Sequence, residues 1–236
     1  MEFAAKVKNN EVLFSTQDSY SYNWFYPRYR NGGLHERKVT ELIIEACKNS
    51  KTFFDIGAHI GFFTCVIAKL FPHIHVHSFE MEEKVFELLV TNVQLNKLNN
   101  VHMHNCAVSD INGLVCYDKP DAPNEKTAIA ENGTSKIKSI SLDGLGIVPD
   151  VIKIDVEGTE LDVLKGMKKV LPKVKALFIE IHPNLYEKGT AEKILEFLKD
   201  FRVYEICDHR RRGDPDMIKV ESAEFVYNNM LYAFRY

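Results

Sequence analysis

Short apolar runs alternate along most of the chain with apolar residues at helical spacing. The run at 52–57 (T-F-F-D-I-G) is typical of a buried strand ended by glycine, and after it Phe62, Val66 and Leu70 recur every four residues. The same order of strand and helix repeats, which indicates parallel strands joined by right-handed crossovers. We therefore predict an α/β fold, with core strands at 52–57, 73–80, 101–108, 151–158 and 175–182 and helices at 61–70, 82–96, 160–171 and 190–201.

The alternation breaks in the middle of the chain and at both ends. Turn residues such as Asn112-Gly113 and Pro120 interrupt the region 110–146, where the runs 114–118 and 134–140 predict two short inserted antiparallel strands. Two further strands are predicted near the C-terminus, and the first 50 residues are predicted to form an N-terminal appendage with an aromatic segment and one helix. We place those strands at 202–207 and 225–234, that helix at 36–48, and a single α/β domain at 51–236.

Composition and charge argue against several classes of protein. The formal net charge of −3 gives no overall basic field for nucleic acid, and no apolar run approaches the roughly 20 residues of a membrane-spanning helix. The five cysteines include no C-x-x-C pair, and the start of the chain lacks the apolar core of a secretion signal. We therefore expect reduced thiols and a cytoplasmic protein that binds neither nucleic acid nor membrane.

The segment D-I-G-A-H-I-G (55–61) joins the first core strand to the first helix. In a doubly wound sheet this turn lies at the carboxyl edge, where ligands bind, and Gly57 and Gly61 can take backbone angles that let a ligand approach the main chain. Glu80 ends the next strand about twenty residues on, in the place of a carboxylate that holds ribose hydroxyls. The simpler alternative is that both glycines only form a tight turn.

The spacing of the glycines favours S-adenosylmethionine over a dinucleotide. The loop spells G-x-x-x-G, whereas dinucleotide-binding enzymes use G-x-G-x-x-G, whose middle glycine lets the pyrophosphate touch the backbone. His59 stands in that place here. A cofactor with a ribose and no pyrophosphate fits better, so we predict S-adenosylmethionine, with Asp55 holding its amino group directly or through water.

Four ionisable residues end two neighbouring strands. Asp155 and Glu157 end the fourth core strand, and Glu180 and His182 end the fifth. Methyl transfer to a hydroxyl requires groups that align the acceptor and remove its proton. Like charges placed close together raise the pKa of one carboxylate toward the range of a base. We therefore predict that these four residues are catalytic.

Other interpretations of this cluster stay open. Asp155 and Glu157 can instead cap the helix that follows them, and His182, which precedes Pro183, can bond the backbone in a turn. A divalent metal ion among Asp155, Glu180 and His182 is a third alternative, because oxygen and imidazole ligands suit several ions. We predict no metal.

Five blocks of the sequence resemble the FkbM family of S-adenosylmethionine-dependent methyltransferases. They run in the order in which the family has them and lie within about 53–182, more than half of the chain. The blocks are D-I-G-A-H-I-G (55–61), F-E-M (79–81), L-N-K-L-N-N-V (95–101), A-V-S-D-I-N-G (107–113) and I-D-V-E-G-T-E-L-D-V-L-K-G (154–166). Two residues depart from the family pattern where the cofactor would lie: His59 replaces an asparagine and Met81 replaces a proline.

The resemblance implies a fold, a cofactor and site residues. The fold is the Rossmann-like class I methyltransferase fold, a seven-stranded, mostly parallel sheet with an antiparallel last strand, so that 51–236 is the methyltransferase catalytic domain. Met81 would pack on the adenine. A glutamate before the glycine-loop strand, here Glu36, would lie near the active site, and we count it with the candidate catalytic residues. The cofactor-binding residues implied in this way are Ala58, His59, Met81, Asn105, Cys106 and Ala107, beside Asp55, Gly57, Gly61 and Glu80.

The segment Y-S-Y-N-W-F-Y-P-R-Y-R (20–30) carries six aromatic residues and two arginines. One interpretation is a lid that stacks on a flat substrate such as a sugar ring, with Arg28 and Arg30 meeting phosphate or carboxylate. The other, which we favour slightly, is an apolar segment that seals the sheet. The run R-R-R (210–212) is predicted to be a solvated loop.

The sequence thus predicts a methyltransferase that moves the methyl group of S-adenosylmethionine to an oxygen, foremost a hydroxyl on a sugar, glycan or natural product. The expected partner is a small-molecule or glycan acceptor, and the sequence does not indicate an oligomeric state. A nicotinamide-dependent oxidoreductase is one alternative, against which the missing middle glycine argues. A non-catalytic S-adenosylmethionine-binding protein is the other, because fold alone does not settle function.

Overall fold

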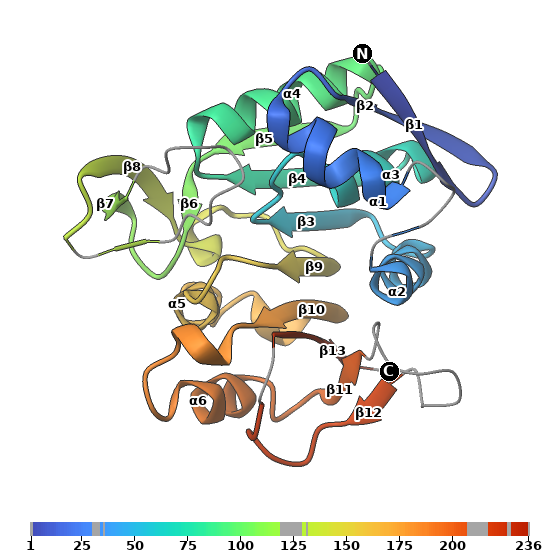
Figure 1. The fold of residues 1–236 in the computed structure, drawn as a ribbon. Helices are drawn as coiled ribbons and strands as arrows, with labels where there is room; N and C mark the ends of the chain where they lie inside the picture. Colours follow the sequence, from blue (N-terminus) through green and yellow to red (C-terminus); the bar gives the residue numbers. More distant parts are fainter. Residues whose placement is uncertain are drawn as a thin grey trace.

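A large mixed sheet forms the centre of the protein (Figure 1). The computed structural model describes residues 2–29, 34, 36–118, 129–130, 132–206, 217–225 and 228–235. Within these residues the sheet has eight strands, in the order β12 (Met217–Lys219), β11 (Arg202–Ile206), β13 (Asn229–Phe234), β10 (Ala176–Ile181), β9 (Val151–Ile154), β3 (Thr52–Ile56), β4 (His75–Glu80) and β5 (Val101–Asn105). The five strands from β10 to β5 are parallel, and β13 runs antiparallel between β10 and β11.

This arrangement confirms the predicted α/β fold and its antiparallel last strand. The sheet has one strand more than the seven expected, because β12 pairs antiparallel with β11 at the edge. Sequence analysis missed β12, which has only three residues. Arg30 and the run 210–212 lie outside the described residues.

Several expected elements are shorter than predicted, and for two of them the structure shows the cause. Helices α3 (Phe62–Leu70), α4 (Glu83–Leu95), α5 (Glu160–Lys165) and α6 (Thr190–Phe197) connect the strands, and β6 (Ala107–Val108), β7 (Gly113–Tyr117) and β8 (Ser135–Ile140) form a small second sheet. The strand expected at 101–108 is divided, because β6 leaves the main sheet to pair with β8. The helix expected at 160–171 ends at Gly166, where a Cβ atom would lie 2.1 Å from the carbonyl oxygen of Ser109.

Two hydrophobic cores cover the two faces of the main sheet. Helices α2 (Arg37–Cys47), α3 and α4 pack on one face, where Phe53 and Phe178 are fully buried. Helices α5 and α6 pack on the other, where Phe54 and Leu177 are fully buried. Neighbouring residues of one strand enter different cores because side chains alternate across a sheet. No described helix is long and apolar enough to span a bilayer.

A row of polar side chains crosses the centre of the sheet on the α3 face. Lys153 on β9 lies opposite Asp55 on β3, and Asp55 lies opposite Ser78 on β4. The Asp55 carboxylate accepts hydrogen bonds from the backbone N–H and the hydroxyl of Thr64 in α3, at 3.0 and 2.7 Å. The Thr64 hydroxyl also lies 2.7 Å from that of Ser78. The row fixes the first helix to the central strands at the carboxyl edge.

The N-terminal residues form more than the predicted single helix. They comprise the antiparallel hairpin β1 (Glu2–Val7) and β2 (Asn10–Ser15), the π-helical turn η1 (Ser21–Phe25) and α1 (Tyr26–Tyr29). The hairpin was missed, although Ala5 and Val7 on β1 and Val12 and Phe14 on β2 alternate on either side of its two-residue turn, and all four are buried. Alternation of this kind around a short polar turn is a sequence signal for a hairpin.

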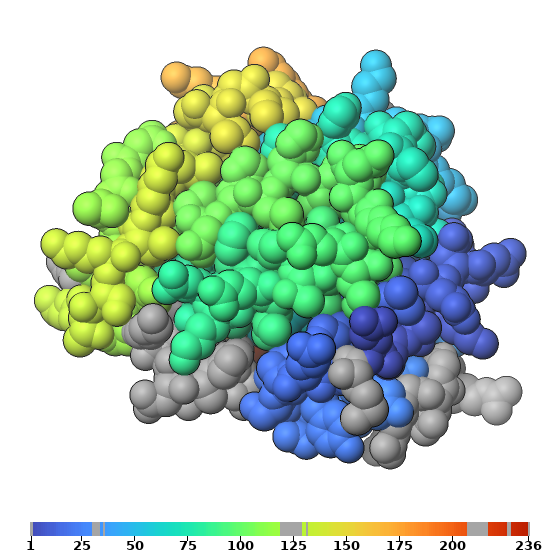
Figure 2. Space-filling view, turned by 90° about the horizontal axis from the view of Figure 1, so that it is seen from above, coloured from blue at the N-terminus to red at the C-terminus, as the bar shows by residue number. Residues whose placement is uncertain are grey.

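The hairpin is attached to α4 through two buried asparagines. Asn92 accepts a hydrogen bond from the backbone N–H of Ser15 at 2.9 Å and donates one to the carbonyl of Ile60, in the loop before α3, at 2.8 Å. Asn96 bonds both backbone groups of Leu13. Figure 2 shows the N-terminal residues in blue against the green residues of the α4 region. The N-terminal segment is therefore packed on the helices beside the site.

Replacing Asn92 by alanine should destabilise the whole protein. Asn92→Ala leaves the Ser15 N–H and the Ile60 carbonyl without their bonds in a buried place, which costs about 2–4 kcal/mol of unfolding free energy. Urea unfolding measures the change. The control is Asn99→Ala at an exposed position nearby, expected to stay within about 0.5 kcal/mol. Equal effects of the two variants would show that the hairpin is not anchored through Asn92.

Candidate active site

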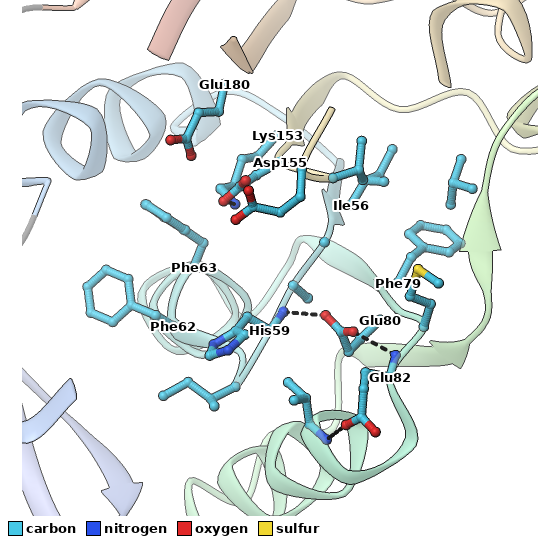
Figure 3. A pocket seen from close by; sticks show the side chains of 18 of the residues that line it. Ile56, His59, Phe62, Phe63, Phe79, Glu80, Glu82, Lys153, Asp155 and Glu180 are labelled. Carbon is cyan, nitrogen blue, oxygen red and sulfur yellow. Dashed lines mark hydrogen bonds and ion pairs between the residues drawn. The ribbon is translucent and has the colours of Figure 1, made fainter. Parts of the chain in front are cut away.

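A cavity of about 460 Å³ opens at the carboxyl edge of the sheet, where β3, β4, β9 and β10 end. Its volume is in the range of ligand-binding pockets. Figure 3 shows Glu180, Lys153 and Asp155 at one end and Phe79 and Glu80 toward the other. The cavity thus has an acidic end and an end that is apolar apart from its buried glutamates.

The glycine loop turns sharply between β3 and α3, and both glycines are also required by packing. Gly57 lines the cavity and has φ 74°, and a Cβ atom there would lie 1.8 Å from the carbonyl oxygen of Asp155. Gly61 has φ 84°, does not line the cavity, and a Cβ atom there would lie 2.4 Å from Leu89 of α4. The glycines let β9 and α4 approach the loop, and the approach of a ligand to the backbone stays a prediction, for which only Gly57 lies at the cavity.

Glu80 at the end of β4 lines the cavity and holds the glycine loop. Its two carboxylate oxygens accept hydrogen bonds from the backbone N–H groups of His59 and Glu82, at 2.9 and 2.8 Å (Figure 3). Burial raises the pKa of Glu80 to about 7, although these bonds favour the charged form. A carboxylate at this place can still accept further hydrogen bonds from a ligand, because each of its oxygens has more than one lone pair.

Glu82 is a cavity residue that sequence analysis missed. Its Oε2 caps α4 by accepting a bond from the backbone N–H of Val85, at 2.8 Å. Its Oε1 is buried, and no described group forms a hydrogen bond with it. A buried acceptor without a bond at the wall of a cavity indicates a place for a ligand donor. The signal in the sequence was a second glutamate two residues after Glu80.

The apolar end of the cavity contains most of the residues expected around the adenine. Met81, Cys106 and Ala107 line it, together with Phe79 and Val108. Asn105 does not line the cavity. Its amide donates hydrogen bonds to the carbonyls of residues 80 and 81, at 3.0 and 3.3 Å, so it holds the strand end that carries Glu80.

Asp55 lies behind the cavity wall. Its side chain is 1% exposed, it does not line the cavity, and its bonds go to Thr64. Lys153, which sequence analysis did not single out, is 3% exposed and lines the cavity in front of it. Its Nζ lies 3.1 Å from Asp155 Oδ2. The signal was a lysine inside the apolar run V-I-K-I, where an unpaired charge would be costly.

Four carboxylates line the acidic end: Glu36, Asp155, Glu157 and Glu180. Burial, then the charges of Asp155 and Glu36, raise the pKa of Glu180 to about 9. Burial would also raise the pKa of Asp155, but Lys153 and then His182 outweigh it and hold that pKa below its ordinary value. Glu180 and Asp155 are hydrogen-bonded to each other, so at neutral pH Glu180 holds the proton and Asp155 the charge.

His182 lies beneath these carboxylates and does not line the cavity. Its Nδ1 is 2.8 Å from Glu160 Oε1, and its Nε2 is 3.2 Å from Glu157 Oε2. Glu160, fully buried at the start of α5, also accepts bonds from the Tyr186 hydroxyl and the Gly158 N–H. Burial lowers the pKa of His182, but Glu160 and then Asp155 and Glu157 together outweigh burial, so this pKa lies above its ordinary value. Sequence analysis missed Glu160.

Aromatic side chains from the N-terminal segment close the remaining side. Tyr20, Trp24, Phe25 and Tyr29 line the cavity beside Phe62. Phe25 and Tyr29 are buried against Phe62, which fits a segment that seals the sheet, whereas Trp24 is 41% exposed at the rim, which fits a lid. The two interpretations describe different side chains of one segment. Arg28 packs on the Trp24 ring at 3.2 Å and does not line the cavity.

Three residues of the cavity wall have left-handed backbone although they are not glycine. They are Glu36, His59 and Glu157, with φ of 53°, 52° and 53°. Such conformations cost roughly 1–3 kcal/mol each and cluster at functional sites. Each lies in a turn at the end of an element, so the turn directs the side chain toward the cavity.

Gly57→Ala should cost far more stability than the backbone angle alone explains. Gly146 has nearly the same φ, 73°, and a Cβ atom there would have no neighbour within 4 Å, so Gly146→Ala measures the backbone contribution, about 1–2 kcal/mol. Gly57→Ala adds a clash with the Asp155 carbonyl and is expected to lose at least about 2 kcal/mol more. Thermal or urea unfolding compares the two. Similar losses would contradict the close contact of the two strand ends.

The cavity can hold S-adenosylmethionine. Buried carboxylates at Glu80 and Glu82 suit ribose hydroxyls or an adenine amino group, and the apolar walls near Phe79 and Met81 suit a flat base. The acidic end suits the positive charge of a sulfonium. S-adenosylmethionine has no pyrophosphate, and the features described above match the parts that it does have.

The comparisons with known proteins agree with this fit. The methyltransferase FkbM domain matches residues 55–213. The hexuronic acid methyltransferase AglP of Haloferax volcanii is 30% identical over 167 residues, which cover 68% of this chain and 68% of that protein. Methyltransferase 1 of Beauveria bassiana is 25% identical over 191 residues, 66% of this chain and 77% of that protein.

A solved structure shares the fold at low sequence identity. The tRNA (uracil-54, C5)-methyltransferase of Pyrococcus abyssi, solved in complex with S-adenosyl-L-homocysteine, has a TM-score of 0.51 and 12% identity, covering 98% of this chain and 43% of that chain. This likeness supports the class I methyltransferase fold. The family match rules out the nicotinamide-dependent alternative. The chain belongs to the FkbM methyltransferase family and is an S-adenosylmethionine-dependent methyltransferase.

Proposed function

We propose that the protein methylates an oxygen of a sugar, foremost a hydroxyl group. The observation that carries this proposal is the pair of carboxyl groups of Asp155 and Glu180 in the cavity wall, with the Lys153 ammonium 3.1 Å from Asp155 Oδ2. The lowered pKa of Asp155 and the raised pKa of Glu180 agree with a pair that shares one proton. An alcohol must lose its proton as it is methylated, and a positioned carboxylate can accept that proton. The cavity thus contains a proton acceptor beside the place for the sulfonium.

The residues of the apolar end would hold the cofactor. Glu80 and Glu82 would accept hydrogen bonds from the ribose or the base, and Phe79, Met81 and Cys106 would pack around the adenine. S-adenosylmethionine supplies a methyl group on a positively charged sulfur, which leaves as a neutral thioether. Asp55 is placed to act indirectly, by holding Lys153 and the start of α3.

The residues of the acidic end would hold the acceptor. Asp155 and Glu180 take up the hydroxyl proton as a pair, while Glu36 and Glu157 offer further acceptors for sugar hydroxyls. Lys153 keeps the charge of Asp155 fixed from below at 3.1 Å.

A sugar is the acceptor class that these surroundings favour. Carboxylates bind several hydroxyls at once, and aromatic rings such as Tyr20 and Trp24 can stack on the apolar face of a sugar ring. The relative AglP is named for activity on a hexuronic acid, which is a sugar acid. The lining residues and the name of this relative both support a carbohydrate as the methyl acceptor.

Transfer of a labelled methyl group tests the function. The panel consists of glycosides of neutral hexoses and hexuronic acids, with radiolabelled S-adenosylmethionine as donor, and product analysis shows which atom is methylated. We expect sugar O-methylation, and Asp155→Asn should reduce kcat by about 10²–10⁴-fold with little change in the affinity for S-adenosylhomocysteine. The exposed control Asp200→Asn should behave as wild type.

Methylation of nitrogen or carbon only would contradict the proposal. A protein that binds S-adenosylhomocysteine and methylates no member of the panel would favour the non-catalytic alternative instead. Equal losses of kcat and cofactor affinity in Asp155→Asn would assign Asp155 to cofactor positioning.

Binding of S-adenosylhomocysteine should depend on pH through Glu80. Its pKa of about 7 leaves the carboxylate mostly neutral at pH 6 and mostly charged at pH 8, and ribose hydroxyls donate better to the charged form. Affinity is therefore expected to rise with pH, by up to about tenfold across this window. Calorimetry of Glu80→Gln should show weak binding without that rise, whereas the exposed control Glu87→Gln keeps it. A flat profile in the wild type would exclude Glu80 as the ribose contact.

A further inference from the structure

His182 lies at the centre of a group of carboxylates but bonds none of them through Nε2. Its side chain is 1% exposed, and no described group forms a hydrogen bond with that nitrogen. Nε2 lies 3.2 Å from Glu157 Oε2, 3.7 Å from Glu180 Oε1 and 3.9 Å from Asp155 Oδ1. A buried nitrogen that lies among three oxygens and forms no hydrogen bond indicates a place for an ion or ligand atom between them.

Glu160 fixes which nitrogen of the ring carries a proton. It accepts hydrogen bonds from the Tyr186 hydroxyl and the Gly158 N–H, at 2.8 and 3.0 Å, and as an acceptor it requires a proton on His182 Nδ1, 2.8 Å away. Nε2 is therefore the nitrogen that faces the three carboxylates, and in the neutral ring its lone pair points at them. A carboxylate that orients the far nitrogen of a histidine is the usual partner of metal-binding histidines.

The surrounding oxygens are also oriented toward this point. The two carboxylate oxygens of Asp155 have different neighbours. Oδ2 pairs with Lys153 at 3.1 Å, and Oδ1 faces His182. Glu157 reaches the point from a left-handed backbone with φ 53°. A second proton on His182 would place a positive charge there, but even the nearest oxygen, at 3.2 Å, lacks the geometry of a hydrogen bond.

We infer that Asp155, Glu157 and His182 bind a divalent transition-metal ion that holds the acceptor, with Glu180 beside it. One ligand atom of each of the three residues lies within 4.8 Å of the others. Ligands about 2.0–2.2 Å from an ion lie roughly 3–4 Å apart, so small side-chain movements complete the site. An imidazole with carboxylates suits Mn²⁺ or Zn²⁺ better than Mg²⁺, which prefers oxygen ligands only.

The site is built to leave coordination positions open. The side chains of Asp155, Glu157 and Glu180 are each about a quarter exposed, and all three line the cavity, whereas His182 closes the site from below. Two neighbouring oxygens of an acceptor can therefore reach the ion from the cavity. The ion would make a bound hydroxyl more acidic, with its proton still passing to the carboxylate pair, and it would allow an acidic acceptor to approach a negatively charged wall.

Metal binding itself, without cofactor or acceptor, is the first test. The full chain is treated with a chelator, freed of it, and titrated with MnCl₂ or ZnCl₂ by calorimetry, with electron paramagnetic resonance of Mn²⁺ in parallel. We expect one site of micromolar affinity, coupling of Mn²⁺ to an imidazole nitrogen, and weaker binding of MgCl₂. Glu157→Gln should weaken Mn²⁺ binding by about 10–100-fold, because it removes one charged ligand. The exposed control Glu187→Gln should bind as wild type.

His182→Gln removes the nitrogen ligand and should abolish the imidazole coupling. Because His182 is buried, this variant can fail to fold, and Glu157→Gln, whose side chain is 25% exposed, then carries the test alone. No saturable binding below millimolar Mn²⁺ and Zn²⁺, or identical affinity in Glu157→Gln and wild type, overturns the inference and leaves the His182–Glu160 pair as a proton carrier.

The inference that the ion holds the acceptor rests on the proposed function. The metal site and the proposed function can nevertheless fail separately. If chelated protein methylates a sugar at the full rate, the role of the ion in holding the acceptor is overturned while the function stands. If the ion binds and no sugar is methylated with or without it, the acceptor class is wrong while the metal site stands. Methylation that is lost on chelation and restored by Mn²⁺ or Zn²⁺ supports both.

Discussion

One buried ammonium group holds together the strand ends on which the site is built. Lys153 is 3% exposed, lies opposite Asp55 across β9 and β3, and contacts Asp155 at 3.1 Å. Removing one member of a buried ion pair typically costs about 3–5 kcal/mol, because the other charge is left uncompensated. The same ammonium keeps the pKa of Asp155 low in spite of burial. The pairing of β9 with β3 positions Lys153, and Lys153 in turn keeps Asp155 charged at the acceptor end of the cavity.

The two ends of the cavity use opposite electrostatic arrangements. At the cofactor end, backbone N–H groups of the glycine loop and of α4 neutralise the buried carboxylate of Glu80. At the acceptor end, Lys153 is the only lysine or arginine among the described lining residues, and it faces four carboxylates. At the first end the Glu80 carboxylate is bonded before a ligand arrives, and Glu82 Oε1 is left for a ligand donor. The second end gathers carboxylates that suit a proton, a sulfonium or a metal ion. Strain is concentrated at the same place, in the left-handed turns of Glu36 and Glu157.

The sequence predicted the order of strands and helices and most of the residues at the cavity, because periodicity and loop chemistry are local signals. It could not show which residues face the cavity. Asp55 and Asn105 lie in core strands as expected, yet neither lines the cavity, because the direction of a side chain at a strand end depends on how the strands pair and twist. Glu160 was missed because its role appears only when Tyr186 and His182 meet it from another strand end. The sequence also did not show that the packing of β9 and α4 requires the two glycines of the loop, because those elements approach the loop only in the folded chain.

The wall contributed by residues 20–29 comes from outside the matched domain. The match to the FkbM domain begins at residue 55, so the hairpin, η1 and α1 precede the part that this chain shares with the domain. Tyr20, Trp24 and Tyr29 nevertheless line the cavity. In this chain the domain match alone therefore does not describe the whole cavity, because one of its walls is supplied by the preceding residues.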